Sequence, residues 1–433
     1  MQQLFLIAYR NLLQHGRRSL LLGGAIAGVT ALLVFLNCLS SGVKATMLES
    51  ATTVVTGHIN VSGFYKVTAG QSAPLVTDYK KIQDIVIKTL PDLDFVAPRG
   101  RGWARLVSDQ GSMQVGMAGV DIAHEPRLPQ VLKMIEGNLQ DLSKPGSVLI
   151  FASQAKKLKV KTGDSMVFSV LTPRGTNNTV DVRVIGIAED MGLLTSWNVF
   201  VPDVTLRALY QLAEGSTGAL LVYIKNMKNS ARDIDLLDKA LNKAGYNVME
   251  RESKAFWMKM QAINREDWTG QKLDLTVWED EISYVSWTLK AIDGITFILT
   301  LVLLVIIAIG IMNSMWIAIR ERTREIGTLR AIGMQRPRVM AMFIIEAFCL
   351  GALGTAAGAL LGCLVAGLLN TMHIHVPEGA QFFLMSTTLK FAFEPGRIFQ
   401  AAFIITLCTT LISMIPSLKA ARLKPVTAMS HIG

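Results

Sequence analysis

The segment Ile295–Arg336 decides the fold, and it reads ITFILTLVLLVIIAIGIMNSMWIAIRERTREIGTLRAIGMQR. Its first part, Ile295–Ile319, has no charged side chain and is long enough as a helix to cross the roughly 30 Å of hydrocarbon in a bilayer. Charged residues, mostly arginines, then follow in quick succession, and Gly333 and Pro337 break the helical pattern. The segment therefore predicts a membrane span that ends in a short basic helix.

Three further uncharged runs predict three more spans, at Ser19–Val43, Ala347–His373 and Ile398–Leu418. The polar region Lys44–Lys290 between the first and second spans is large enough to bury a core of its own. A composition of 51% hydrophobic and 18% charged residues suits such a mixed chain. We predict an α-helical membrane protein with four transmembrane helices and one large extracytoplasmic domain.

The net charge of +10 lies beside the spans. Residues 42–287 carry 28 Lys or Arg and 27 Asp or Glu, so the polar region is almost neutral and binding to nucleic acid loses its support. The excess of basic residues precedes the first span, follows the second and follows the fourth. Because positive charge marks the cytoplasmic side, we expect both termini and the arginine-rich loop in the cytoplasm and the large domain outside, in a multi-pass protein of a bacterial inner membrane.

The extracytoplasmic domain has the pattern of an α+β fold. The β-branched run Thr52–Ser62 predicts a strand, and Phe95–Val107 with Gln114–Val120 predicts a hairpin turning at Asp109–Gly111. Further strand-like runs alternate with helical periodicity, for example in Tyr79–Leu90. We expect two packed subdomains with interleaved chain.

The predicted organisation can be written along the chain. Glu279–Thr288 is expected to start a helix that continues into the second span as a stalk. The predicted segments are an interfacial amphipathic helix at 1–18, spans at 19–43, 339–370 and 397–418, the extracytoplasmic domain at 44–278, the stalk with its span at 279–319, a cytoplasmic loop at 320–338, an extracytoplasmic loop at 371–396 and a cytoplasmic tail at 419–433.

Motifs for catalysis, nucleotides or metals are not found. The phosphate-binding pattern G-x-x-x-x-G-K-[ST] and the hydrolase patterns G-x-S-x-G and H-E-x-x-H do not occur. His373 and His375 have ligand-like spacing, but without a carboxylate or thiol nearby we interpret them as polar loop residues. All four cysteines lie in predicted spans, which leaves none for a disulfide or metal site in the large domain. We expect no enzyme, no catalytic residues, no metal and no cofactor in this chain.

The third span carries a stripe of small residues, Gly354, Gly358 and Gly362, at four-residue spacing. Such a stripe lets another helix approach closely, and the pattern does not say whether that helix belongs to the same chain or to a second subunit. Glu346 lies near the cytoplasmic end of this span, where we expect it near the interface or paired with an arginine. The basic helix after the second span has two interpretations, a helix that docks into a partner or an arginine cluster that only orients the chain.

At this basic segment the sequence resembles the FtsX-like permease family, which includes the exporter MacB, the lipoprotein-releasing pair LolC and LolE, and FtsX itself. The resemblance is carried by Asn313 with the run Glu321–Gly333 (ERTREIGTLRAIG), by Pro416–Met429 (PSLKAARLKPVTAM) and by Ala8–Leu13 (AYRNLL). The order of one span, a large outer domain and three clustered spans also fits. In plan the chain is similar to LolC and LolE, with a MacB-like periplasmic domain.

The resemblance implies a dimer of permeases, homomeric or heteromeric, bound to two copies of an ABC ATPase on a separate subunit that holds ATP and Mg. The loop after the second span would be the coupling helix, and the outer domain would act on substrate already outside the membrane. The coupling residues that this implies are Glu321, Arg322, Arg324, Glu325, Gly327, Arg330, Ala331 and Gly333.

Three functions are compatible with this resemblance. Release of lipoproteins from the inner membrane is the leading expectation. Efflux of an antibiotic, peptide or other amphiphile with a periplasmic adaptor is the alternative. A third possibility, of a different class, is an FtsX-like regulator of cell-wall hydrolases that transports nothing.

Overall fold

The computed structural model describes residues 16–68, 72–172 and 175–422. Most of the predicted interfacial helix 1–18 and the end of the predicted tail 419–433 lie outside these residues. The chain divides into two compact units. The helical unit comprises Met1–Ala45, Lys290–Ile374 and Thr388–Gly433, and the sheet unit comprises Thr46–Leu289 and His375–Thr387.

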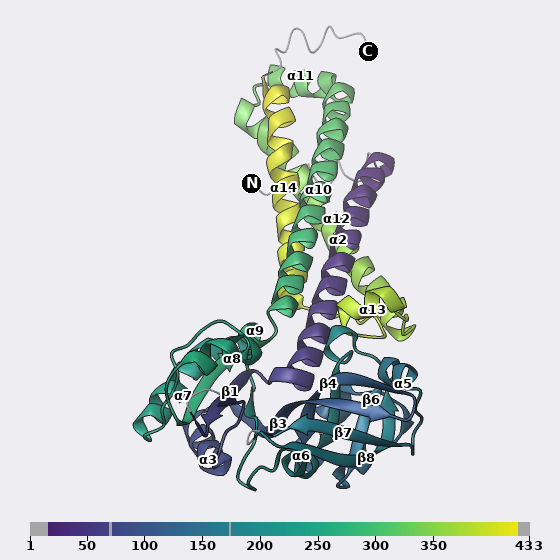
Figure 1. The fold of residues 1–433 in the computed structure, drawn as a ribbon. Coiled ribbons are helices and arrows are strands. Elements are labelled where there is room, and N and C mark those ends of the chain that lie inside the picture. The colour runs from purple at the N-terminus through teal and green to yellow at the C-terminus, as the bar shows by residue number, and fades with distance from the viewer. Residues whose placement is uncertain (1–15, 69–71, 173–174, 423–433) are drawn as a thin grey trace. The chain divides into compact units, whose positions relative to one another are not determined.

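Four helices of the described chain are long and apolar enough to cross a membrane, as the sequence predicts (Figure 1). They are α2 (Gly16–Ala51), α10 (Ser283–Glu321), α12 (Arg336–Thr371) and α14 (Pro395–Ala421). Large apolar side chains such as Phe297 and Leu360 are 69% and 74% exposed. Exposure on this scale is tolerated in lipid and not in water, so the helices belong in a membrane.

Several predicted limits differ from the helices observed. The first helix continues to Ala51, past the predicted limit at 43, because backbone hydrogen bonding carries on through polar residues that end a hydropathy run. The predicted stalk is not one continuous helix. A short helix, α9 (Trp278–Glu281), ends at Ile282, whose extended φ of −126° breaks the helix before α10 begins.

Two short helices occupy the connections between spans. α11 (Thr323–Ala331) lies between α10 and α12, within the predicted loop 320–338. α13 (Glu378–Leu384) lies within the predicted loop 371–396, and residues 375–387 of that loop group with the sheet unit. The last connection is therefore part of a folded domain instead of a simple turn between spans.

The sheet unit contains eleven described strands in one sheet, ordered β11-β1-β10-β3-β4-β9-β6-β8-β5, with β2 on β1 and β7 between β3 and β8. The strands are β1 (Ile59–Lys66), β2 (Ser72–Ala73), β3 (Leu93–Ser108), β4 (Gly111–Val120), β5 (Met134–Gly137), β6 (Ser147–Phe151), β7 (Ser165–Leu171), β8 (Asn177–Ala188), β9 (Asn198–Pro202), β10 (Ala219–Ile224) and β11 (Gly270–Val277).

The remaining helices of this unit cover the sheet. The α-helices are α3 (Tyr79–Thr89), α4 (Leu128–Val131), α5 (Ala152–Leu158), α6 (Asp203–Tyr210), α7 (Ser230–Lys243) and α8 (Phe256–Arg265). Short 3₁₀ turns are η2 (Ile122–His124), η3 (Leu139–Ser143), η4 (Gly192–Leu194) and η5 (Met227–Asn229).

The long strand β3 joins two subdomains, which confirms the predicted α+β fold. Its first half pairs with β10, and its second half pairs with β4 and β7. One core forms where α3 and α7 pack on β1, β10 and β11, around residues such as Val61 and Leu237. A second core forms among β4, β6, β7 and β8, around residues such as Phe168 and Val184. The two subdomains therefore share one sheet but have separate cores.

The predicted strand Thr52–Ser62 is wrong in its first half. Residues Thr52–Thr56 form a π-helical turn that extends α2, and β1 starts only at Ile59. A π turn leaves carbonyls with distorted bonding, and tertiary partners satisfy them. Arg99 Nη1 donates to the carbonyls of Thr53 and Val54 at 2.9 and 2.8 Å, and Tyr223 Oη donates to Thr52 O at 3.1 Å. These partners lie far along the sequence, so the local β-branched pattern is overruled.

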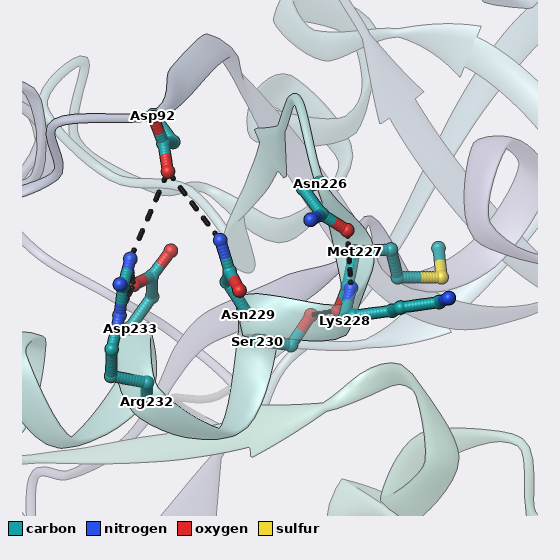
Figure 2. A network of polar contacts seen from close by, with 8 residues as sticks. All are labelled: Asp92, Asn226, Met227, Lys228, Asn229, Ser230, Arg232 and Asp233. Atoms are coloured by element: carbon teal, nitrogen blue, oxygen red, sulfur yellow. Dashed lines mark hydrogen bonds and ion pairs between the residues drawn. The ribbon is translucent and has the colours of Figure 1, made fainter.

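Polar contacts attach the start of α7 to the turn before β3 (Figure 2). Asn226 accepts a hydrogen bond from the amide of Lys228, which starts η5. Asp92 accepts a hydrogen bond from Asn229 at 3.4 Å and lies 3.8 Å from a guanidinium nitrogen of Arg232. The contacts are exposed or only partly buried, so they define where α7 begins more than they stabilise it.

Candidate functional site

The connecting helix α11 has one face held by the rest of the helical unit. Arg322, just before the helix, is 3% exposed and pairs with Glu346 of α12 at 3.0 Å and with Glu325 at 3.3 Å. Arg330 donates a hydrogen bond to the carbonyl of Ala421, at the end of α14, at 2.6 Å. A buried guanidinium needs such a counter-ion, so α11 is anchored at both ends. The prediction that Glu346 pairs with an arginine is confirmed.

The opposite face of α11 is exposed. Of the predicted coupling residues, Arg322, Gly327 and Arg330 belong to the anchored side, whereas Glu321, Arg324, Glu325, Ala331 and Gly333 are exposed. Gly333 has a φ of +103°, which ends the helix in a conformation that glycine adopts without strain. Beside it, the side chain of Ile332 is 80% exposed.

The glycine stripe of α12 faces α2 of the same chain. A Cβ atom on Gly354 would come within 2.9 Å of Ile26 Cγ2, one on Gly358 within 2.3 Å of the carbonyl of Ala27, and one on Gly362 within 2.6 Å of the carbonyl of Ala31. Two of these contacts are with backbone atoms, so the two helices approach as closely as glycine permits. The sequence left open which helix would fill this role.

A cavity of about 640 Å³ opens in the sheet unit where its subdomains meet. Side chains alternate along β3, so Trp103 and Arg105 lie on the side of the cavity while Ala104 and Leu106 point into the second core. Cavities of this size accommodate small organic molecules. The exposed apolar side chains of Val67, Trp103 and Leu171 all lie in its lining, which concentrates apolar surface in one place.

Tyr210 of α6 holds the central part of this lining. Its hydroxyl donates to the carbonyl of Trp103 and accepts from the amide of the same residue, both at 2.7 Å. Gly102 makes room for the ring, because a Cβ there would lie 2.5 Å from Tyr210 Cε2. Burial raises the pKa of Tyr210 to about 12, so the hydroxyl keeps its proton and both hydrogen bonds at neutral pH.

Buried charges lie behind the cavity wall. Both terminal nitrogens of Arg101 are buried and have no hydrogen-bond partner among the described residues, and the guanidinium lies 4.4 Å from the ring centre of Phe256. Lys259 and Asp274, both buried, form an ion pair at 2.8 Å. Burial lowers the pKa of Arg101 and raises the pKa of Glu281. Charged side chains thus lie buried behind the lining of the cavity.

Sequence reasoning missed this cavity because its lining comes from separate elements, β3, β7, α6 and α8. The one available signal was the alternation of Arg101, Trp103 and Arg105 on a strand whose other face is apolar. His373 and His375 do not join a metal site. The described residues hold no group of three or more histidine, cysteine, aspartate or glutamate side chains that suits a metal ion.

Comparison with known proteins agrees with the helical unit. The family model described as FtsX-like permease C-terminal matches residues 297–425, which run from α10 through α14. The macrolide export ATP-binding/permease protein MacB of Agrobacterium fabrum is 24% identical over 428 residues, covering 96% of this chain and 59% of that protein. MacB of Nitrobacter winogradskyi is 26% identical over 431 residues, covering 96% and 58%. The chain therefore spans less than two thirds of these relatives.

Solved structures that resemble parts of the chain include the periplasmic region of MacB from Actinobacillus actinomycetemcomitans, at 14% identity and a TM-score of 0.31, covering 53% of this chain and 94% of that one. The extracellular domain of the noncanonic ABC-type transporter YknZ from Gram-positive bacteria matches at 13% identity and a TM-score of 0.31, covering 43% and 94%.

The four-helix membrane unit and the sequence matches together define a class, that of membrane permeases. Over most of its length the chain is similar to FtsX/MacB-type ABC permeases, and residues 297–425 match the FtsX-like permease C-terminal family.

Proposed function

We propose that the chain is the permease subunit of a MacB-type transporter, in which α11 receives the motion of ABC ATPase subunits and the sheet unit acts on substrate on the other side of the membrane. The observation that carries the proposal is the two-sided character of α11. One face is anchored to α12 and α14 by Arg322 and Arg330, and the other is exposed. A helix held in this way transmits a push on its exposed face to the spans.

The exposed end of α11 offers an anchor for a partner. Ile332 is 80% exposed, and a single apolar side chain that enters a pocket of a partner often dominates binding. The excess of basic residues near this loop supports a cytoplasmic position, where ATP is available. The same proposal includes that two permeases form a dimer, that two ATPase copies bind it, and that both termini of the chain are cytoplasmic.

The test is co-purification of ATPase activity. The tagged chain is purified in mild detergent from its native membrane, and the magnesium-dependent ATP hydrolysis that elutes with it is measured. Ile332→Asp is expected to remove at least nine tenths of this activity, because a carboxylate in an apolar pocket costs several kcal/mol. Ile135→Asp is the matched control, since Ile135 is also exposed, at 54%, but lies in the sheet unit. Equal ATPase activity in both variants would refute the assignment of α11.

Arg330 is a poorer test than its sequence position suggests. Its guanidinium holds the end of α14, so reversing its charge would disturb the packing of the helical unit as well as any partner. Glu325, with a side chain 64% exposed, is more accessible but pairs with buried Arg322 at 3.3 Å. Glu325→Gln, which removes the charge without placing a cation beside Arg322, is expected to weaken ATPase binding while the unit stays folded.

For the substrate, we propose export of an amphiphile. The names of the relatives refer to macrolide export, and the apolar cavity of the sheet unit supports a small ligand. Release of lipoproteins remains the competing function. Proteoliposomes that contain the chain and its ATPase distinguish the two functions. ATP-dependent release of a lipoprotein into solution, without movement of a small amphiphile, would favour lipoprotein release over export.

A further inference from the structure

The described lining of the cavity in the sheet unit carries more basic than acidic side chains. It includes three arginines, Arg101, Arg105 and Arg207, and one acid, Asp203. Asp203 is already paired with Arg207 on the same helix. Among the described lining residues, Arg101 and Arg105 therefore have no lining carboxylate as a partner.

Arg105 is the cation that a ligand would meet. It lies on β3 and is exposed, and its guanidinium donates to the hydroxyl of Ser112 at 2.8 and 3.2 Å. Among the described residues it has no carboxylate partner within ion-pair distance. Arg101 lies behind the wall, where its buried nitrogens do not reach the space and the acids Glu281 and Asp274 offset its charge.

The polar row around Arg105 is built by strand register. Gln114 of β4 and Ser169 of β7 lie directly opposite Arg105 on either side, and both line the cavity. Amide, hydroxyl and guanidinium donors side by side suit an anionic oxygen. Beyond this row the wall becomes apolar, with Trp103 and Leu171 exposed. The lining thus carries hydrogen-bond donors at one part and apolar side chains at the next.

We propose that this cavity binds a small anionic amphiphile, an aromatic or acyl body with one acidic group, whose anion lies against Arg105 and whose apolar part lies against Trp103. The inference deepens the proposed transport function and rests on it for its physiological meaning. Arg105 supplies charge recognition, and Trp103, whose backbone is held by the hydroxyl of Tyr210, supplies apolar contact through its ring.

The experiment is photolabelling of the full chain in lipid nanodiscs without ATP. The probe is 4-benzoylbenzoate, which carries one carboxylate, and benzophenone is the uncharged probe of the same skeleton. Labelled peptides are identified by mass spectrometry, and Met260 of α8, which lines the cavity, is the expected acceptor. Arg105→Gln is expected to reduce labelling by 4-benzoylbenzoate about tenfold, as the loss of a charged hydrogen bond requires. Labelling by benzophenone should change less than twofold.

Three further variants make the result specific. Trp103→Ala should reduce labelling by both probes. Arg105→Lys, which keeps the charge, should retain most of the labelling by the anion. Arg183→Gln is the matched control, because Arg183 is exposed on β8 of the same sheet but does not line the cavity. It should leave both probes unchanged.

Salt provides a test that needs no variant. Labelling of the unmodified chain by 4-benzoylbenzoate should fall several-fold between low salt and about 0.5 M NaCl, while labelling by benzophenone stays constant. The proposal is overturned if Arg105→Gln labels as the wild type does, if labelling by the anion ignores salt, or if the cavity peptides are not labelled. These outcomes are independent of ATPase co-purification, so a failure here does not count against the role of α11.

Discussion

The contact between α2 and α12 should be intolerant of a single methyl group at Gly358. In Gly358→Ala the new Cβ would lie 2.3 Å from the carbonyl oxygen of Ala27, which is backbone and has no rotamer to change. Relief requires the helices to separate by roughly 1 Å. Gly367→Ala is the control on the same helix, because its Cβ would meet only Phe393 Cζ at 3.8 Å, an ordinary contact.

The magnitude follows from comparing the two variants. Overpacking a close interface costs about 1 to 3 kcal/mol. Replacing glycine by alanine within a helix returns about 0.5 to 1 kcal/mol, and this gain is common to both variants. The difference in the free energy of unfolding between Gly358→Ala and Gly367→Ala is therefore about 1 to 3 kcal/mol. Gly362→Ala, whose Cβ would lie 2.6 Å from a backbone oxygen, should cause the next largest loss in the free energy of unfolding. Gly354→Ala should cause the smallest loss of the three, because its Cβ would meet a side chain first.

The native cysteines provide the assay. All four lie in the membrane helices, with Cys38 buried in α2, so a fluorogenic maleimide reports unfolding of the helical unit without a signal from the sheet unit. On heating in detergent, the midpoint of Gly358→Ala should lie roughly 2 to 12 °C below that of Gly367→Ala. Equal midpoints would refute the close approach of α2 and α12.

Two further predictions concern the sheet unit. Burial, and next the positive charge of Arg127, lowers the pKa of His58 from its ordinary 6.5 to about 4. The neutral imidazole is therefore favoured in the folded state. Its contribution to the free energy of unfolding is fully present above pH 6.5 and is lost as the pH falls towards 4. Chemical unfolding should show a loss of up to about 3 kcal/mol over this window, and His58→Asn should remove that slope. Glu125→Gln should cost about 3 kcal/mol or more, because it removes the counter-ion of buried Arg99, which lies 2.6 Å away. The exposed Asp121→Asn is its control, and a similar effect from both would contradict this reasoning.

Features that depend on composition over many residues were predictable. The four spans follow from uncharged runs that only a bilayer can accommodate, and the α+β character of the large domain follows from its alternating patterns. The segment after the second span was identified through its arginines. Its division into an anchored and an exposed face was not, because Arg322 and Arg330 are held by Glu346 and Ala421, which belong to other helices.

Local patterns were misleading where distant partners act. Thr52–Thr56 has the composition of a strand but forms a π turn, since Arg99 and Tyr223 bind its carbonyls. The predicted stalk helix breaks at Ile282, for which the sequence offers no glycine or proline. In both places the local preference amounts to a few tenths of a kcal/mol per residue, which a buried hydrogen bond easily exceeds.

The sequence by itself therefore determined that this chain has four membrane helices, a folded polar domain and a basic connecting segment, because hydrophobicity and charge act residue by residue. Only the tertiary structure decided which helix meets the glycine stripe, which face of α11 is exposed, and that Arg105 and Trp103 share a cavity with residues of α6 and α8. These features arise where segments distant in sequence pack together, and a linear pattern carries no record of that contact.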